Sequence, residues 1–323
     1  MIVVTGGAGF IGSCFVQKLN QMGIDDILIV DHLRENDKWK NLVGKKFEDY
    51  IDKIDFPDLL ADGCFDDTID SVVHIGACSS TTETDTNYLM ENNYRYTKFL
   101  AQTCLKNNIK FYYASSAATY GDGELGFSDE DVKTPDYRPL NMYGYSKHLF
   151  DLWVLKNELQ DKLTGFKFFN VFGPNEYHKD SMRSLVHKAL PDARDNCMIR
   201  LFKSYNPEYS DGGQTRDFVY VKDVLNVMAY FFEHPDIGGI YNIGTGKAQS
   251  WNELANAMFA ALNVKGEIEY IDMPDQLKDK YQYFTKADLT KLRRAGCDYE
   301  FMTLKDSIAD YIQNHLMKSN PYL

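Results

Sequence analysis

The chain has 323 residues, of which 44% are hydrophobic and 25% are charged, and its formal net charge is −12. This composition is typical of a globular protein with one large domain and an appendage, or with two domains. The acidic charge argues against a protein that grips nucleic acid or an anionic membrane, and no stretch approaches the roughly 20 apolar residues of a membrane-spanning helix.

Strand-like and helix-like segments alternate through the first half of the chain. The expected strands are short and rich in β-branched or aromatic residues, and they cover 1–4, 26–30, 72–75, 110–114 and 166–169. Helices are expected at 12–22, near 87–107 and at 144–160. The alternation predicts an α/β fold with a doubly wound parallel sheet, a Rossmann fold. Because the first strand lacks the basic leader of an export signal, we expect a cytoplasmic protein.

The pattern changes after residue 174. Residues 175–215 are polar and predicted to be loop-rich, whereas later strands are expected at 217–221 and 240–243, and helices at 251–262 and 304–316. We expect a dinucleotide-binding Rossmann domain over 1–172, with segments near 217–250 returning to its sheet, and a smaller α/β substrate-binding domain over 173–323. The six cysteines lack paired spacing, so free thiols are predicted and no metal site is.

A glycine-rich loop, Thr5-Gly6-Gly7-Ala8-Gly9-Phe10-Ile11-Gly12, joins the first expected strand to the first helix. Gly6, Gly9 and Gly12 allow a tight turn and bring the backbone close to a pyrophosphate, which the N-terminus of the helix can bind. Asp31 follows the last glycine by about 20 residues, as the dinucleotide fingerprint expects. The loop therefore predicts a nicotinamide dinucleotide site.

The residues alone leave NAD and NADP open. Asp31 suits the ribose hydroxyls of NAD and would repel the additional phosphate of NADP. A basic cluster behind the second strand could instead bind that phosphate, and it favours NADP. Its members are Arg34, Lys38, Lys40 and Lys53.

Tyr143 and Lys147 lie four residues apart, so on a helix they share one face. A phenol has an ordinary pKa near 10, so it is a poor base at neutral pH. A neighbouring ammonium and a positive nicotinamide would both lower the pKa of Tyr143, which could then accept a hydroxyl proton. Ser116 ends the preceding strand and could bind the reacting oxygen or cap a turn.

The glycine loop, Ser116 and the Tyr143–Lys147 pair together resemble the extended short-chain dehydrogenase/reductases, which oxidise, epimerise or dehydrate nucleotide sugars. Five further stretches are similar to the ADP-L-glycero-D-manno-heptose 6-epimerase family, namely 74–82, 113–121, 169–179, 216–221 and 275–282. The resemblance covers nearly the whole chain. It implies NADP as cofactor and ADP-heptose as substrate, inverted at carbon six for lipopolysaccharide biosynthesis by a homo-oligomer, with a pentamer as one form.

The resemblance also implies roles for individual positions. The implied cofactor contacts are Phe10, Ile11, Asp31, His32, Lys38, Lys53, Ile75, Gly76, Ala77, Cys78, Ser79, Asn92, Lys147 and Val171. The implied substrate contacts are Ser116, Asn170, Ser181, His187 or Lys188, Phe202, Arg216 and Tyr281. Position 75 is isoleucine here, whereas relatives carry an acid. The implied cofactor contact at this position can therefore be made by the backbone but not by an acidic side chain.

Tyr143 and Lys179 would be the two acid/base groups of the implied reaction. Inversion of a carbinol carbon without an acidic hydrogen needs transient oxidation, followed by return of the hydride to the other face. The oxygen points differently in the two steps, so two groups on opposite sides serve better than one. Without the resemblance, Lys179 would be an ordinary surface lysine, and Arg216 could equally form a structural ion pair.

Three alternatives share this fold. A 4,6-dehydratase carries an Asp-Glu pair where this chain has Ala117 and Ala118, which cannot transfer protons. A UDP-hexose 4-epimerase shares the Ser-Ser-Ala signature and stays open, with Lys179 and the neighbouring His178 as the discriminating residues. A non-catalytic NADP-binding protein also stays open, although such proteins often lose the Tyr/Lys pair.

Overall fold

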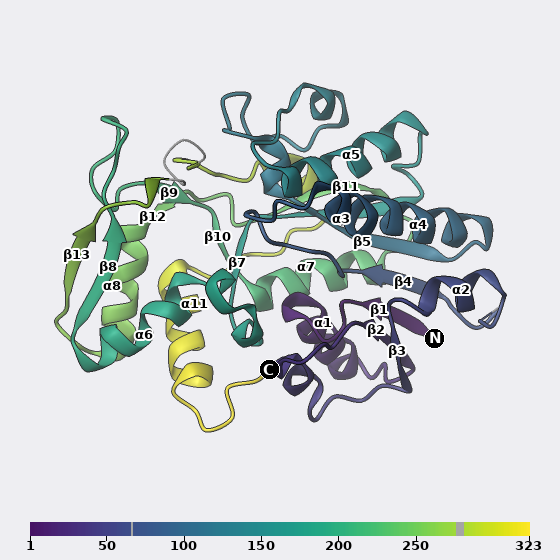
Figure 1. Ribbon diagram of the computed structural model, residues 1–323, viewed down its shortest axis with the longest axis horizontal. Coiled ribbons are helices and arrows are strands. Elements are labelled where there is room, and N and C mark those ends of the chain that lie inside the picture. The colour runs from purple at the N-terminus through teal and green to yellow at the C-terminus, as the bar shows by residue number, and fades with distance from the viewer. Residues whose placement is uncertain (66, 276–280) are drawn as a thin grey trace.

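The computed structural model describes residues 1–65, 67–275 and 281–323, so residues 276–280 of the 275–282 stretch lie outside the described residues. Its centre is a seven-stranded sheet in which every neighbouring pair is parallel (Figure 1). In spatial order the strands are β11 (Gly239–Ile243), β6 (Leu163–Phe168), β5 (Lys110–Ser116), β4 (Ser71–His74), β1 (Ile2–Thr5), β2 (Ile27–Asp31) and β3 (Asp49–Asp52). This sheet is the doubly wound Rossmann sheet that the alternating pattern predicts.

Helices cover both faces of the sheet, which gives three layers (Figure 1). One face packs against α1 (Phe10–Gln21) and α7 (Val221–Glu233). The other face packs against α2 (Phe56–Ala61), α4 (Tyr96–Lys106) and α5 (Met142–Lys156).

Both faces of the strands are apolar because both are covered. In β1, Val3 belongs to the core under α2, α4 and α5, whereas Val4 belongs to the core under α1 and α7. Phe111 and Tyr112 of β5 divide in the same way. Such continuous apolar runs are typical of a buried parallel strand.

A smaller α/β region lies beside the sheet. Its strands β8 (Met198–Phe202) and β13 (Glu267–Ile271) pair in parallel. The helices α6 (Leu185–Asp195), α8 (Trp251–Leu262) and α11 (Leu304–Tyr311) pack around them (Figure 1).

Short elements complete the described structure. The strands are β7 (Asn170–Phe172), β9 (Thr215–Arg216), β10 (Phe218–Tyr220) and β12 (Gln249–Ser250). The helical turns are η1 (Asp37–Leu42), α3 (Thr86–Leu89), η2 (Met90–Arg95), η3 (Ala117–Tyr120), η4 (Asp131–Asp136), η5 (Tyr177–Met182), α10 (Thr290–Arg294) and η6 (Ile312–Leu316). None of the described helices is long and apolar enough to cross a membrane.

The prediction that residues 175–215 are loop-rich was partly wrong, because α6 and β8 lie within this segment. In α6 the apolar residues Val186, Leu190 and Ala193 follow one face and are buried, but polar residues between them hide the pattern. The prediction that the second half returns to the main sheet is confirmed by β11. Helix α7 was not predicted.

Candidate active site

The predicted functional residues gather where the parallel strands end. Thr5, Asp31, His74 and Ser116 are the last residues of β1, β2, β4 and β5. Ligands of open α/β sheets bind at this edge. Strand ends that are far apart in the sequence therefore form one candidate site.

The glycine loop has the shape that a pyrophosphate needs. Gly6 has φ +67°, and a Cβ on it would lie 2.6 Å from the Cα of Gly76. A Cβ on Gly12 would lie 2.1 Å from the carbonyl oxygen of Gly6. Gly9 precedes α1 and offers no side-chain cap, so the first N–H groups of the helix have no side-chain acceptor there. These residues fit a dinucleotide phosphate.

Asp31 is already bound by the protein. Its buried carboxylate accepts a hydrogen bond from the Ala8 N–H at 2.9 Å and forms an ion pair with the Lys38 ammonium. The next residue, His32, contacts the Asp52 carboxylate through Nδ1 at 2.8 Å. The negative charge of Asp31 is therefore balanced by Lys38, which reduces its repulsion of a further phosphate.

Lys53 and Asn92 also meet, and they line one pocket together with Tyr88 and Tyr96. The Lys53 ammonium donates a hydrogen bond to the Asn92 side-chain oxygen. Burial lowers the pKa of Lys53, and the charges of Arg34 and Lys38 lower it further. Three members of the predicted basic cluster, Arg34, Lys38 and Lys53, therefore lie near enough for their charges to interact, whereas the fourth, Lys40, pairs with Asp37.

Asn93 is a supporting residue that the sequence reasoning missed. It is fully buried, its side chain bonds both the N–H and the carbonyl of Cys78 at 2.9 Å, and it donates to the Ser146 hydroxyl at 3.1 Å. It thereby ties the 75–79 segment to helix α5. The available signal was an Asn-Asn pair inside a helical stretch, where asparagine is a poor helix former.

Tyr143 and Lys147 both lie on α5, next to the end of β5. The Lys147 ammonium donates to the Ala114 carbonyl at 2.8 Å, and the Ser116 side chain lies near enough to the Tyr143 hydroxyl to lower its pKa. The Ser116 hydroxyl also accepts from the Ala118 N–H at 3.1 Å, so it caps η3 as well. The three residues that the sequence singled out are therefore neighbours.

The lowered pKa expected for Tyr143 depends in part on a positive nicotinamide, and burial of the phenol acts against it. Burial raises the pKa of Tyr143, and the neighbouring Ser116 side chain opposes this rise only in part. Burial also lowers the pKa of Lys147 to about 8, which still leaves the amine mostly charged at pH 7. At neutral pH Tyr143 is therefore a phenol.

A buried polar network, also missed, lies behind Tyr143 and fixes α5 to the sheet. Asp151 of α5 accepts hydrogen bonds from Tyr113, Ser115 and Lys167, the last at 2.6 Å. Lys167 also donates to Thr119 at 2.8 Å. Removing one partner of this network would leave a buried charge uncompensated.

Lys179 lies over the dinucleotide loop. Its ammonium is 5.5 Å from the centroid of the Phe10 ring, at the start of α1. Burial lowers the pKa of Lys179, and the Glu176 carboxylate opposes that shift. A lysine with a lowered pKa exchanges its proton more readily near neutral pH.

The predicted substrate residues form two sets. In the first, the Lys188 ammonium donates to the Ser181 carbonyl at 3.2 Å, and the His187 ring packs on Tyr177, with centroids 5.4 Å apart. Burial lowers the pKa of His187 to about 4, so its ring is neutral at pH 7. The second set surrounds Arg216. No hydrogen bond or ring contact within the described ranges joins these predicted residues across the two sets.

Arg216 is buried, and its guanidinium lies 4.9 Å from the centroid of the Tyr281 ring. One guanidinium N–H donates to the Thr215 carbonyl at 2.9 Å. In the part of the chain that the structure describes, no carboxylate forms an ion pair with it, so the structural ion pair considered from the sequence is absent there. A buried guanidinium that meets no carboxylate among the described residues suits a diphosphate.

Three predicted residues have weaker ties to the site. Asn170 is exposed, and its N–H donates to the Asp217 carbonyl at 3.1 Å. Val171 is half-buried in β7. The Phe202 carbonyl accepts from the Gln214 side chain at 3.4 Å.

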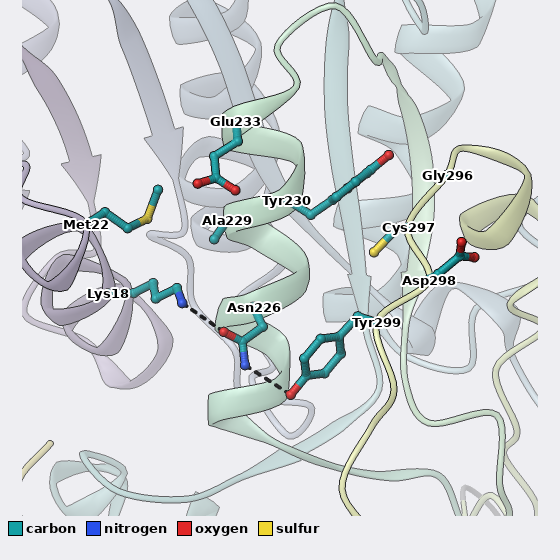
Figure 2. A pocket seen from close by; sticks show the side chains of 10 residues that line it. All are labelled: Lys18, Met22, Asn226, Ala229, Tyr230, Glu233, Gly296, Cys297, Asp298 and Tyr299. Atoms are coloured by element: carbon teal, nitrogen blue, oxygen red, sulfur yellow. Dashed lines mark hydrogen bonds between the residues drawn. The ribbon is translucent and has the colours of Figure 1, made fainter.

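A separate cavity contains none of the predicted site residues. It lies between α1, α7 and the 296–299 segment (Figure 2). Lys18 donates to Asn226 at 2.9 Å, and Asn226 donates to Tyr299 at 3.0 Å across it (Figure 2). These hydrogen bonds join the two helices to the 296–299 segment.

Residues 2–244 match the NAD dependent epimerase/dehydratase family. This span contains all seven strands of the main sheet, the glycine loop and both Tyr143 and Lys179. The chain belongs to this family. Membership in the family indicates a nicotinamide dinucleotide as cofactor, in agreement with the shape of the loop.

Closely similar members of the family carry one name. A Nitratidesulfovibrio vulgaris (strain DP4) protein is 51% identical over 323 residues, and a Fusobacterium nucleatum protein is 50% identical over 333, each match covering 100% of both chains. Both are named ADP-L-glycero-D-manno-heptose-6-epimerase. The crystal structure of the Helicobacter pylori protein of that name is 28% identical, with TM-score 0.79, covering 97% of this chain and 95% of that one. The resemblance stated from the motifs is thus confirmed.

Proposed function

We propose that this protein inverts carbon six of ADP-D-glycero-D-manno-heptose, giving the L-glycero epimer for lipopolysaccharide biosynthesis. The observation that carries the proposal is that two groups able to transfer protons lie near the carboxyl ends of the parallel strands. Lys179 lies over Phe10 of the dinucleotide loop, and Tyr143 lies beside Ser116 at the end of β5. The names of relatives at 50–51% identity support the choice of substrate.

The bound nicotinamide dinucleotide supplies a reversible hydride acceptor, which is regenerated in each turnover. Ser116 binds the carbon-six oxygen and orients it toward Tyr143 Oη. One of the two groups, Tyr143 or Lys179, removes the hydroxyl proton as the carbon-six hydride departs, which leaves a ketone. After the ketone presents its other face, the second group protonates the oxygen as the hydride returns.

We propose NADP as the dinucleotide, with Arg34, Lys38 and Lys53 as the ligands of its 2′-phosphate. Lys53→Met should weaken NADP binding by about tenfold and NAD binding far less, because only NADP loses a charge-assisted hydrogen bond. Isothermal titration with each dinucleotide measures this difference. Lys46→Met, at an exposed lysine paired with Asp25, is the control. Equal losses for both dinucleotides would contradict the assignment.

We propose that Arg216 binds the diphosphate of the substrate. Arg216→Met should raise KM by about tenfold or more, because a charge-assisted contact to a buried phosphate is lost. The KM of Arg216→Lys should lie between the values for Arg216→Met and wild type, since a lysine keeps the charge but not the two-pronged geometry of the guanidinium. Steady-state kinetics measure both variants. An unchanged KM in Arg216→Met would place the diphosphate elsewhere.

We further propose that residues 1–172, with segments near 217–250, hold the dinucleotide, and that 173–323 form the substrate-binding domain. The resemblance also leads us to propose a cytoplasmic homo-oligomer. Sedimentation of the purified protein tests the oligomer, and a monomer at working concentration would exclude it.

The decisive assay is incubation of the purified protein with ADP-D-glycero-D-manno-heptose, followed by chromatographic separation of the two epimers. The proposal predicts both epimers at equilibrium. Parallel incubation with UDP-galactose tests the rival 4-epimerase function, and turnover of that substrate alone would replace the proposal. Tight dinucleotide binding without turnover of either sugar nucleotide would favour a non-catalytic protein.

A further inference from the structure

The side chains of the four residues before Lys179 are fixed by several distant parts of the chain. Residues 175–178 leave the sheet region after β7 and lead directly into the lysine. Their side chains bond α1, η1, α6, α11 and the segment after η6. No step of the reaction described above uses these contacts.

Asn175 is the first anchor. It is fully buried, and its side-chain amide donates to the Ser13 hydroxyl of α1 at 2.9 Å. Its side-chain oxygen accepts from the Leu323 N–H at 2.9 Å, and the Leu323 carbonyl accepts from the Lys45 ammonium at 2.6 Å. Residues 318–323, yellow in Figure 1, thus run from η6 to the region beside α1.

Tyr177 is the second anchor to the same segment. Its hydroxyl donates to the Pro321 carbonyl at 2.7 Å. Its ring packs edge-on against the Tyr322 ring, with centroids 5.1 Å apart. Two residues of the loop are therefore held by the last three residues of the described chain.

Glu176 closes the far end of the loop. Its buried carboxylate accepts hydrogen bonds from the Ser184 N–H and hydroxyl at 2.5 and 2.6 Å, and from the Tyr311 hydroxyl at 2.9 Å. Between these anchors, Asp180 adopts φ +46°, a conformation that costs a non-glycine residue free energy. The surrounding contacts must hold this strained turn in place.

We propose that residues 321–323 act as a strap that positions Lys179, with Tyr177 and Tyr322 as positioning residues for the second proton transfer. The catalytic role of Lys179 rests on the proposed function. The positioning of Lys179 by the strap does not depend on that function. A flexible lysine stem needs a fixed loop to bring its amine to one place, and misplacement of a reacting group by about 1 Å can cost roughly 100-fold in rate.

Lys179 is half-buried, and burial lowers the pKa of its amine. The charged or titratable neighbours of its ammonium are Glu176, which raises its pKa, and His178, to which its charge is coupled. If the loop loosened, water would reach the amine and its pKa would rise toward the ordinary lysine value. That rise is a signature that a general loss of stability would not confine to one lysine.

The test compares Tyr322→Ala and Tyr177→Phe with wild type, and uses Ser319→Ala, at an exposed residue of the same segment, as the control. Each protein is treated with trace acetic anhydride over a pH series, and peptide mass spectrometry gives the titration of every lysine. Tyr322→Ala should move the Lys179 titration to higher pH, raise the acetylation of the fully deprotonated Lys179 amine at the high-pH plateau, and lower kcat by about tenfold. KM, dinucleotide affinity and the other lysines should change little, and Ser319→Ala should match wild type.

A folded Tyr322→Ala protein with the wild-type Lys179 titration would overturn the strap, and so would equal changes at all lysines. If Tyr322→Ala does not fold, Tyr177→Phe carries the same test, since it removes only the hydroxyl that bonds Pro321. Acetylation needs no substrate, so the two proposals fail separately. If the wild-type protein does not convert ADP-heptose but Tyr322→Ala still shifts the Lys179 titration, the proposed function is wrong and the strap is supported.

Discussion

Tyr143→Phe should lower kcat for epimerisation by about a thousandfold, within the range of a lost general acid/base. Phenylalanine keeps the ring packing on α5 but lacks the hydroxyl that lies beside Ser116 and that would exchange the substrate proton. Dinucleotide binding should be retained, because the Lys147 ammonium and the glycine loop are untouched. Kinetics with ADP-heptose and titration with NADP measure the two effects.

Tyr94→Phe is the matched control for that variant. Tyr94 also stands four residues before a lysine, Lys98, whose ammonium lies 5.8 Å from the Tyr94 ring centroid. It lies in η2 and packs against the core under α2, α4 and α5, and its hydroxyl has no proposed role. Wild-type turnover in Tyr143→Phe, or an equal loss in both variants, would remove Tyr143 from the mechanism.

Lys179→Met should produce a loss of similar size, about a thousandfold in kcat. Methionine keeps an unbranched apolar stem to pack over Phe10 but has no amine to carry the second proton. The dinucleotide should still bind, and any ketone formed would be reduced only on the face that Tyr143 serves. Separation of the two epimers after long incubation measures the residual rate.

The control for this variant is Lys162→Met, at an exposed lysine in the turn before β6. It should turn over like wild type. Normal epimerisation by Lys179→Met would mean that one group serves both faces, and the two-group mechanism would be wrong.

Much of the fold was predictable because its signals are local. The apolar strands, the glycine loop and the helix over 251–262 each follow from neighbouring residues in the sequence. The same holds for the Tyr143–Lys147 pair, whose spacing on a helix is fixed by the helix itself. The ends of parallel strands then bring such motifs together without further information.

The rest depends on contacts between distant residues. The sequence around Asn93 does not indicate that its amide bonds both Cys78 and Ser146. The three hydrogen-bond partners of Asp151 come together only in the folded chain. The raised pKa of Tyr143 follows from burial, which motif spacing does not measure. The strap joins Pro321 to Tyr177, and these residues lie more than 140 positions apart in the sequence.

The central claim is that the carbon-six hydrogen leaves as hydride and returns to the same carbon. The most direct measurement uses ADP-D-glycero-D-manno-heptose with deuterium at carbon six, converted by the purified protein in ordinary water and examined by mass spectrometry. The proposed mechanism predicts that the L-glycero product keeps its deuterium at carbon six. Replacement of the deuterium by solvent hydrogen would show inversion through proton loss from carbon and would contradict the mechanism.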